Sequence, residues 1–244
     1  MSNYIVSVII VTRGYRDYID ACLNSLTGQG YRDMEIVVVD NSENEDFAKD
    51  IKERFPQINL YSAQGNLYYC AALNKGIGMS KGDLILCLND DVILEKDFLA
   101  EALKALERDR KIGMVSAKLL RRDGKTIDSA GLFLSIWRSP LERGYGLKDT
   151  GQFEHQEYIF GVNGAAAFYR KEMLEDIRFG AEYFDSDFRI FYEDMDISWR
   201  AQRLGWKCYY TPKAIAYHIR GGTVRQQQGI NQRYARHYLD DSLH

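Results

Sequence analysis

Two unbroken apolar runs, each ending in a polar residue, constrain the fold of this 244-residue chain more than any other feature. They are Val6–Thr12 and Met34–Asp40. Continuous β-branched runs of this kind are typical of parallel strands buried on both faces. Between them, apolar residues recur at helical spacing from Tyr18 to Leu26. The chain therefore begins with a strand–helix–strand unit, whose crossover should be right-handed.

The alternation of helical and strand patterns continues through residue 88. We expect helices over residues 45–55 and 70–79, and strands over residues 58–61 and 83–88. This order predicts a doubly wound sheet. Ligands of such sheets bind beyond the carboxyl ends of the strands. Here those ends carry Thr12, Asp40 and the triplet Asn89-Asp90-Asp91, which are predicted to line one crevice.

The second half is less regular. We expect a helix over 97–107, a strand over 113–120, loops and short strands from 121 to 157, a helix from about 194 to 204, and a strand over 207–210 before Pro212. No linker rich in Pro, Gly or Ser separates the halves. The interpretation is one domain over residues 1–222, with a first half to about residue 95 and a second half from about residue 96. Residues 223–244 are expected to form a polar tail or docking helix.

Composition narrows the function classes. At 45% hydrophobic and 27% charged residues, the chain is not disordered. It has no apolar run long enough to span a membrane and no secretory signal pattern, so we expect a cytoplasmic protein. The net charge of −3 argues against a nucleic-acid partner. The four cysteines are far apart, which indicates reduced thiols rather than zinc ligands or disulfides.

Three groups of residues could carry chemistry, and each has a structural alternative. The triplet Asn89-Asp90-Asp91 suits Mg²⁺ or Mn²⁺ bound to phosphate, or simply a turn after a strand. Glu193 and Asp194 lie among aromatic residues, where a carboxylate can act as a general base, or they are acidic residues favoured at a helix N-terminus. His218 precedes a Gly-Gly loop and could reach a metal or phosphate, or serve a structural role.

In their order along the chain, these segments resemble family 2 glycosyltransferases, in particular a bacterial rhamnosyltransferase-like branch. The resemblance covers about residues 5–222. It rests on Val6–Thr12, Glu35–Ser42, Gly65–Leu67 with Ala71–Gly76, Lys81–Asp83, Asn89–Asp91, Gly164–Ala166 with Arg170–Glu172, Phe184–Asp196, Gly205-Trp206 and Pro212–His218. The resemblance implies a GT-A fold: a Rossmann-like, mostly parallel α/β sheet flanked by helices, with a smaller acceptor-side lobe. It also implies inversion at the anomeric carbon.

The resemblance implies that residues 1 to about 95 are the nucleotide-sugar-binding half and residues about 96 to 222 the acceptor and catalytic half. It also assigns the donor side residue by residue. Thr12 and Asp40 would hold the nucleotide base, and Asn89 the ribose. Asp91 would be the metal ligand, with His218 completing the metal shell as in some members. Arg13, which replaces the usual tyrosine of the family, would face phosphate or solvent, and Tyr68 replaces a frequent glycine. The remaining residues placed at the nucleotide sugar are Asn66, Asn74 and Asp90.

On the acceptor side, the resemblance makes Asp194 the catalytic base and Glu193 the residue that orients it. Gly164 lies on this side, and Tyr192 or Trp199 could pack against the acceptor ring. The implied enzyme uses Mn²⁺ or Mg²⁺ and moves a sugar, with rhamnose favoured, from a dTDP- or UDP-sugar to a lipid-linked or polysaccharide acceptor. The alternative is a catalytically silent nucleotide-sugar-binding subunit. A homodimer stays open, and weak peripheral membrane contact could come from arginines near the C-terminus.

Overall fold

The computed structural model describes residues 4–136 and 140–219. Its strands are β1 (Val6–Thr12), β2 (Met34–Asp40), β3 (Asn59–Ser62), β4 (Leu84–Asn89), β5 (Val92–Leu94), β6 (Ile112–Arg121), β7 (Ile127–Ser129), β8 (Leu132–Leu134), β9 (Pro140–Glu142), β10 (Glu157–Ile159), β11 (Ala166–Arg170) and β12 (Lys207–His218). Its helices are α1 (Arg16–Thr27), α2 (Glu45–Arg54), α3 (Tyr68–Met79), α4 (Phe98–Leu106), α5 (Lys171–Ile177) and α6 (Glu193–Arg203), with a short 3-10 helix η1 (Ser186–Phe188).

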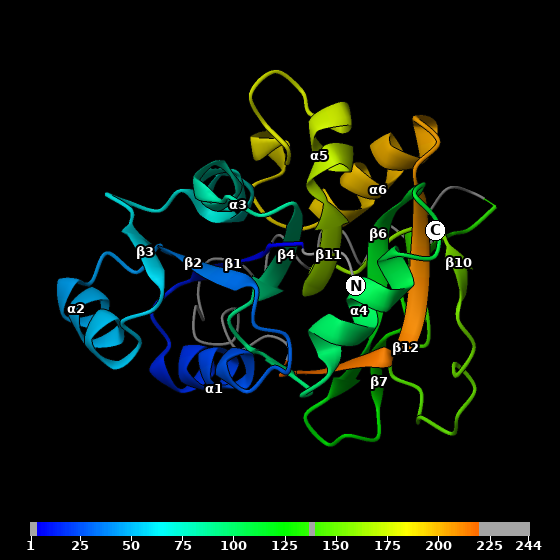
Figure 1. Ribbon diagram of the computed structural model, residues 1–244, viewed down its shortest axis with the longest axis horizontal. Helices are drawn as coiled ribbons and strands as arrows, with labels where there is room; N and C mark the ends of the chain where they lie inside the picture. Colours follow the sequence, from blue (N-terminus) through cyan, green and yellow to red (C-terminus); the bar gives the residue numbers. More distant parts are fainter. Residues whose placement is uncertain (1–3, 137–139, 220–244) are drawn as a thin grey trace, which may run out of the picture.

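One ten-stranded sheet runs through the protein in the order β10-β12-β6-β11-β4-β1-β2-β3, with β5 beside β12 and β7 beside β6 (Figure 1). Strands β1 to β4 are mutually parallel, which confirms the predicted doubly wound sheet. Strand β11 runs antiparallel between β4 and β6. The residues that precede β11 therefore lie at the same edge of the sheet as the carboxyl ends of β1, β2 and β4. That edge carries the candidate site.

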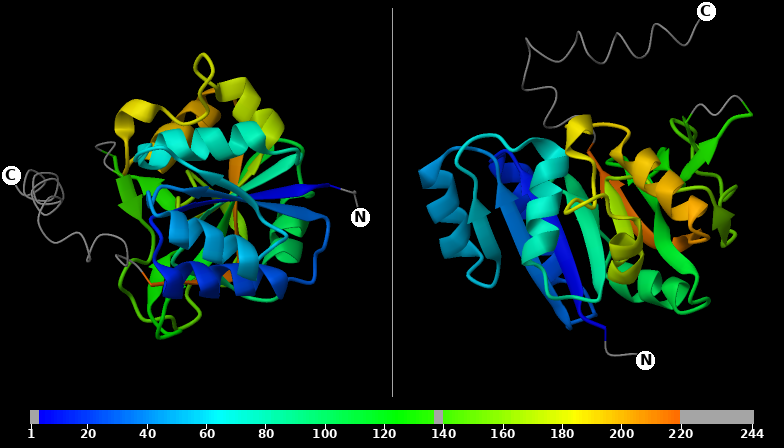
Figure 2. Two further views of the ribbon diagram at one scale, coloured as in Figure 1. Left: turned by 90° about the vertical axis from the view of Figure 1, so that its left-hand side faces the viewer. Right: turned by 90° about the horizontal axis from the view of Figure 1, so that it is seen from above.

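Helices cover both faces of the sheet (Figure 2). Side chains alternate along β1: Val8 and Ile10 pack with α1, α2 and α4 on one face, whereas Ile9 and Val11 pack with α3, α5 and α6 on the other. All seven residues of β1 are buried, as expected of a strand covered on both faces. The apolar run at the start of the sequence thus positions the central strand.

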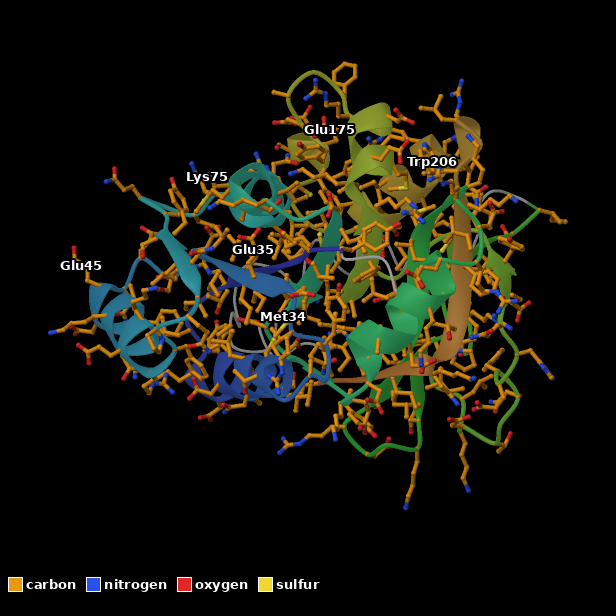
Figure 3. All side chains as sticks on the ribbon, in the orientation of Figure 1. Met34, Glu35, Glu45, Lys75, Glu175 and Trp206 are labelled. Carbon is orange, nitrogen blue, oxygen red and sulfur yellow. The ribbon has the colours of Figure 1, made fainter. Side chains whose placement is uncertain are left out.

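Helix α3 approaches β1 closely because it carries glycine at position 76. A Cβ on Gly76 would lie 2.4 Å from Cγ2 of Ile9, too close for any other residue without a shift. Figure 3 shows Lys75 on α3, Glu175 on α5 and Trp206 on the same side of the sheet, in the layer that includes α6. This layer carries both Asn74 and the acid pair at the start of α6.

The elements predicted from the first half are all present, with ends within two residues of the predicted ones. The predicted strand over 207–210 was wrong in length, because β12 continues through Pro212 to His218. The register between β12 and β6 shifts between Thr211 and Ile215. Proline lacks the N–H that a regular ladder needs, and such an irregularity accommodates it. The longer strand brings His218 to the carboxyl edge of the sheet.

The irregular region after β6 forms short strands and loops, as predicted. It contains β7, β10 and a separate two-stranded sheet of β8 and β9. The buried ammonium of Lys118 on β6 anchors it through ion pairs with Glu154 and, at 2.6 Å, with Asp149. Within residues 4–136 and 140–219, no helix is both long and apolar enough to cross a membrane. The predicted tail at 223–244 lies outside the described residues.

Candidate active site

The ends of β1 and β2 place Thr12 directly beside Asp40. Both side chains are buried. Asp40 Oδ1 accepts a hydrogen bond of 2.8 Å from the backbone N–H of Ser42. Thr12 Oγ1 donates to Asp90 Oδ2 at 2.7 Å, which ties the end of β1 to the turn after β4. The structure therefore brings Thr12, Asp40 and the Asn89–Asp91 triplet to one edge of the sheet.

Asp90 is buried beneath this edge. Burial raises the pKa of Asp90 to about 7, although the hydrogen bond from Thr12 opposes the shift. Its neighbour Asn89 accepts a 2.7 Å hydrogen bond at Oδ1 from the hydroxyl of Tyr69 on α3. Asp90 and Asn89 are therefore both fixed by protein partners on either side of the strand end.

Asp91 faces His218, the last residue of β12. Asp91 Oδ1 lies 3.3 Å from Nε2 of His218, and Nδ1 of the same ring lies 2.8 Å from Oδ2 of the buried Asp128. Burial alone would lower the pKa of His218, but its bonds to Asp128 and Asp91 raise it to about 9. Without a bound cation, the imidazole of His218 is therefore protonated on both nitrogens and lies between the carboxylates of Asp91 and Asp128.

The spacing of Asp91 and His218 fits a divalent cation. Two cis ligands, each ~2.1 Å from an octahedral ion, lie ~3 Å apart, close to the 3.3 Å between Oδ1 and Nε2. The described residues contain no group of three or more His, Cys, Asp or Glu side chains arranged for a metal. Two protein ligands are enough for Mg²⁺ or Mn²⁺, because such ions take their other ligands from substrate phosphates and water.

Arg13, just after Thr12, has a buried Nη1 atom without a hydrogen-bond partner in the described part of the chain. An unpaired buried guanidinium nitrogen is costly, so an anionic group of a ligand would fit beside it. Asn66 is exposed and accepts a 2.9 Å bond from the backbone N–H of Tyr68 at the start of α3. Asn66 therefore shapes the beginning of this helix.

Asn74 was predicted to line the nucleotide sugar, but the structure places its side-chain amide against protein backbone. Its Nδ2 donates to the carbonyl of Phe184 at 2.7 Å, and its Oδ1 accepts from the N–H groups of Tyr183 and Phe184 at 3.0 and 2.9 Å. Nδ2 also donates to Oγ of Ser186 at 3.4 Å, so four bonds fill the hydrogen-bonding capacity of the amide. Asn74 thus fastens α3 to the segment that leads to the acid pair.

Glu193 and Asp194 are the first two residues of α6. Asp194 Oδ2 accepts a 3.0 Å hydrogen bond from the N–H of Gly164, and Oδ1 accepts one of 2.8 Å from Met195. A Cβ on Gly164 would lie 3.4 Å from Cβ of Asp194 and 3.3 Å from Oε1 of Glu193. Glycine at 164 therefore allows the acid pair to pack against the start of β11, the neighbour of β4.

Burial raises the pKa of both acids. For Glu193, the negative charge of Asp194 adds to the effect of burial, and its Oε2 is buried without a hydrogen-bond partner in the described residues. For Asp194, the N–H of Gly164 opposes the effect of burial, and the charge of Glu142 on β9 reinforces it. A carboxylate with a raised pKa is well suited to accept a proton near neutral pH.

Tyr192 and Trp199 have different surroundings. Tyr192 comes directly before the acid pair, is 43% exposed and has a left-handed backbone with φ 64°. Phe191 before it is also left-handed, at φ 73°. Such backbone strain in non-glycine residues is often found at functional sites. Trp199 instead packs edge-on against Phe160, with ring centroids 5.9 Å apart.

Sequence reasoning missed three side chains at the site: Asp128, Tyr69 and Glu142. Asp128 and Glu142 lie in short strands of the irregular region, which has no periodicity to indicate where each side chain points. Asn163, just before Gly164, donates through Nδ2 to Glu142, which holds β9 next to the acid pair. Tyr69 lies one residue before the predicted start of its helix, and an aromatic residue there gives no functional signal.

A mostly parallel sheet flanked by helices, with Asp91 and His218 paired at its carboxyl edge and a buried carboxylate pair beside it, fits the GT-A fold of glycosyltransferases. The chain belongs to glycosyl transferase family 2, because the model of that family matches residues 7–178. This finding confirms the family and the fold expected from the sequence. It does not extend to the rhamnosyltransferase-like branch.

The sequence identity to individual relatives is below 30%. The chain is 27% identical over 256 residues to the amylovoran biosynthesis glycosyltransferase AmsB of Erwinia amylovora, covering 98% of this chain and 78% of that protein. It is 24% identical over 224 residues to the poly-beta-1,6-N-acetyl-D-glucosamine synthase of Staphylococcus aureus strain MSSA476, covering 87% of this chain and 49% of the synthase. This chain thus spans about half the length of the synthase.

Among solved structures, the mannosyltransferase PcManGT of Pyrobaculum calidifontis, in complex with GDP-Man and Mn²⁺, superposes with a TM-score of 0.64 at 19% sequence identity. The match covers 90% of this chain and 58% of the mannosyltransferase. At this level of identity the similarity establishes the fold alone.

Proposed function

We propose that this chain is a metal-dependent, inverting glycosyltransferase that moves a sugar from a dTDP- or UDP-sugar to a lipid-linked or polysaccharide acceptor in surface glycan synthesis. The observation that carries the proposal is the pairing of Asp91 with His218 at the edge of the sheet, 3.3 Å apart. A second acidic centre, at Asp194, lies beside the same edge. The relatives named for amylovoran biosynthesis and for poly-beta-1,6-N-acetyl-D-glucosamine synthesis support a polysaccharide product.

The residues divide the chemistry between them. Asp194 accepts the proton of the acceptor hydroxyl while that oxygen forms a bond to the anomeric carbon. The bond from this carbon to the diphosphate oxygen breaks, and the nucleoside diphosphate leaves. One base on the acceptor side is sufficient for a single displacement with inversion. Glu193, its neighbour in the chain, would orient or tune the base. A bound Mn²⁺ or Mg²⁺ would stabilise the negative charge on the departing diphosphate.

The donor side supports a pyrimidine nucleotide. The carboxylate of Asp40 can accept from the imide N–H of uracil or thymine, and Thr12 lies beside it. The unpaired nitrogen of Arg13 suits a phosphate or another anionic donor group. The Mn²⁺ in the complex of the mannosyltransferase neighbour supports a cation, while the GDP-Man in that complex shows that the fold also accepts a purine donor. Rhamnose as the sugar rests on the resemblance of the motifs.

The decisive experiment uses the purified chain. A thermal-shift panel of UDP-, dTDP- and GDP-sugars with Mn²⁺ should show the largest stabilisation for a UDP- or dTDP-sugar, because a ligand that binds the folded state raises the melting temperature. Turnover of that donor, measured with Mn²⁺, with Mg²⁺ and with chelator, tests for metal-dependent transfer. A chain that binds the donor but never turns it over would instead be a silent binding subunit. The observation that favours this alternative is Asn89, which stands where the resemblance would place a carboxylate.

Two broader aspects belong to the same proposal. We expect cytoplasmic action with weak, salt-sensitive attachment to anionic membranes through Arg220, Arg225, Arg233 and Arg236, which lie outside the described residues. Sedimentation with anionic liposomes at low and high salt tests this, and tight binding at high salt would contradict it. Sedimentation velocity would decide whether the chain forms a homodimer.

A further inference from the structure

Asp128 contacts the inner nitrogen of His218, and the proposed mechanism makes no use of it. The distance between Nδ1 of His218 and Oδ2 of Asp128 is 2.8 Å, shorter than the 3.3 Å from Nε2 to Asp91. Asp128 has no solvent exposure. The ring of His218 is thus held between a carboxylate at the edge of the sheet and another inside the protein.

The backbone places Asp128 there through an irregularity between β6 and β7. Ser129 pairs with Leu119 and Ile127 pairs with Leu120, so Asp128 is the one extra residue on β7. A bulge of this kind changes the direction in which a side chain points, and bulges are frequent beside active sites. The local fold therefore directs the carboxylate of Asp128 toward His218 rather than into the regular ladder.

A buried carboxylate is costly unless charge and hydrogen bonds compensate for it. For Asp128, part of this compensation comes from His218 and from Arg121, whose Nε lies 3.9 Å from Oδ1. Arg121 also packs over the ring of Tyr145, 4.9 Å from its centroid. Asp128 therefore makes its short bond to the same residue that pairs with Asp91.

We propose that Asp128 is a positioning residue for the cation. A carboxylate can only accept, so with a cation present Asp128 would hold the single proton of the neutral imidazole on Nδ1 and leave the lone pair of Nε2 for the cation beside Asp91. It also fixes the rotation of the ring. The inference rests on the proposed function, because it assigns Asp128 a role in binding the cation that Asp91 and His218 would share.

The test measures Mn²⁺ affinity by electron paramagnetic resonance, with the full chain and UDP present. Partners of metal ligands typically contribute 10- to 100-fold to affinity, so Asp128→Ala should weaken Mn²⁺ binding by about that factor. Asp128→Asn keeps the shape and an acceptor oxygen but loses the charge. Its Mn²⁺ affinity should therefore lie between those of the wild type and Asp128→Ala. Asp149→Asn removes a partner of Lys118 in the same region, and should lower the melting temperature without changing Mn²⁺ affinity.

A double-mutant cycle separates positioning from general support of the fold. If Asp128 acts through His218, adding Asp128→Ala to His218→Ala should cost no further Mn²⁺ affinity. Nitrogen-15 chemical shifts of the ring, with Mg²⁺ and UDP bound, report the tautomer directly. At a Mg²⁺ concentration that saturates the wild type, we expect the Nδ1-protonated, Nε2-bound ring in the wild-type chain and in most of Asp128→Asn, and a mixture of metal-bound and metal-free rings in Asp128→Ala. The spectrum of His218→Asn assigns the signal.

The outcomes distinguish the two proposals. Wild-type chain that binds no Mn²⁺ with UDP would contradict the proposed function itself. Mn²⁺ binding that is equal in the wild type, Asp128→Asn and Asp128→Ala, or losses that add fully in the double variant, would overturn only the role of Asp128. Should Asp128→Ala fail to fold, Asp128→Asn decides, because wild-type affinity in that variant also overturns the inference.

Discussion

The carboxyl edge of the sheet that carries Thr12, Asp40 and Asn89–Asp91, here called the donor edge, differs from the acid pair Glu193 and Asp194. The difference lies in how the polar groups are hydrogen-bonded. At the donor edge, the side chains of Thr12 and Asp90 bond to each other, and Asn89 bonds to Tyr69. At the acid pair, Glu193 keeps a buried oxygen without a partner in the described residues. Apart from Arg13, whose Nη1 lacks a partner in the described residues, the site residues at this edge are thus bonded to protein groups, whereas Glu193 stays buried with an unpaired oxygen.

The backbone is also more strained at the acid pair than at the donor edge. The donor edge follows regular strands, while the acid pair follows a segment with three left-handed non-glycine residues, Arg189, Phe191 and Tyr192. Side chains of this segment are exposed, including Phe188 and Ile190. Strain and burial that cost stability are expected where a group must react. The comparison therefore supports the proposal that the first region binds the donor and the second transfers the proton.

The largest predicted effect is on the acid pair. Asp194→Asn removes the proton acceptor, and a general base contributes 10²- to 10⁴-fold, so kcat should fall by about 1,000-fold. Stabilisation by UDP with Mn²⁺ should not change, since the donor edge is intact. The matched control is Asp196→Asn, two residues further along α6, where the carboxylate pairs with Arg200. Wild-type turnover of Asp194→Asn would remove Asp194 from catalysis.

The next effect is at the donor edge, where a substitution should weaken the binding of metal and donor, which Asp194→Asn leaves unchanged. Asp91→Asn removes a proposed cation ligand, so Mn²⁺ affinity and turnover at limiting Mn²⁺ should fall by about 100-fold. Donor binding in the presence of Mn²⁺ should weaken as well. Calorimetric titration with Mn²⁺ and UDP measures both quantities. If Asp91→Asn lowered kcat without affecting donor or metal binding, the division between the two regions would be wrong.

A smaller effect tests the base-recognition end of the donor edge. Asp40→Asn should weaken UDP binding by about 10-fold, because a hydrogen bond to a charged acceptor contributes roughly 1.5–3 kcal/mol. GDP binding should change less, which makes the ratio of the two affinities the informative measurement. Asp33→Asn, at the opposite end of β2 and exposed, is the control. Equal losses for UDP and GDP would argue that Asp40 supports the fold rather than the base.

The sequence was sufficient to predict which residues meet at the carboxyl edge of the sheet, for a physical reason. The runs Val6–Thr12 and Met34–Asp40 are long and apolar and form parallel strands. Their carboxyl ends therefore lie at the same edge of the sheet, whatever conformation the loops adopt. The first polar residue after each strand is then placed by the strand itself. The same logic located Asn89, although its hydroxyl partner Tyr69 comes from a helix and could not be read from the pattern.

The other parts of the site depend on tertiary contacts. Asp128 points to His218 because of an extra residue in a three-residue strand, and Glu142 reaches the acid pair through Asn163. Neither arrangement has a periodic signal. The amide of Asn74 was expected at the ligand, yet it binds backbone 109 and 110 residues further along the chain. Register shifts and long-range polar bonds are thus where sequence patterns stop predicting geometry.

The last predicted effect is on stability rather than on binding or turnover, and it tests the unfavourable burial of Glu193 directly. Burial raises the pKa of Glu193 in the folded state above that of the unfolded chain. Its contribution to stability is therefore complete below the unfolded pKa, near 4.3, and is lost as the pH rises through the folded pKa. Glu193→Gln removes this loss, so at pH 8 it should stabilise the fold by about 2 kcal/mol. The gain should vanish at pH 4. Urea unfolding at both pH values measures it, with the exposed Asp187→Asn as control, and a variant less stable at pH 8 would show that Glu193 supports the fold.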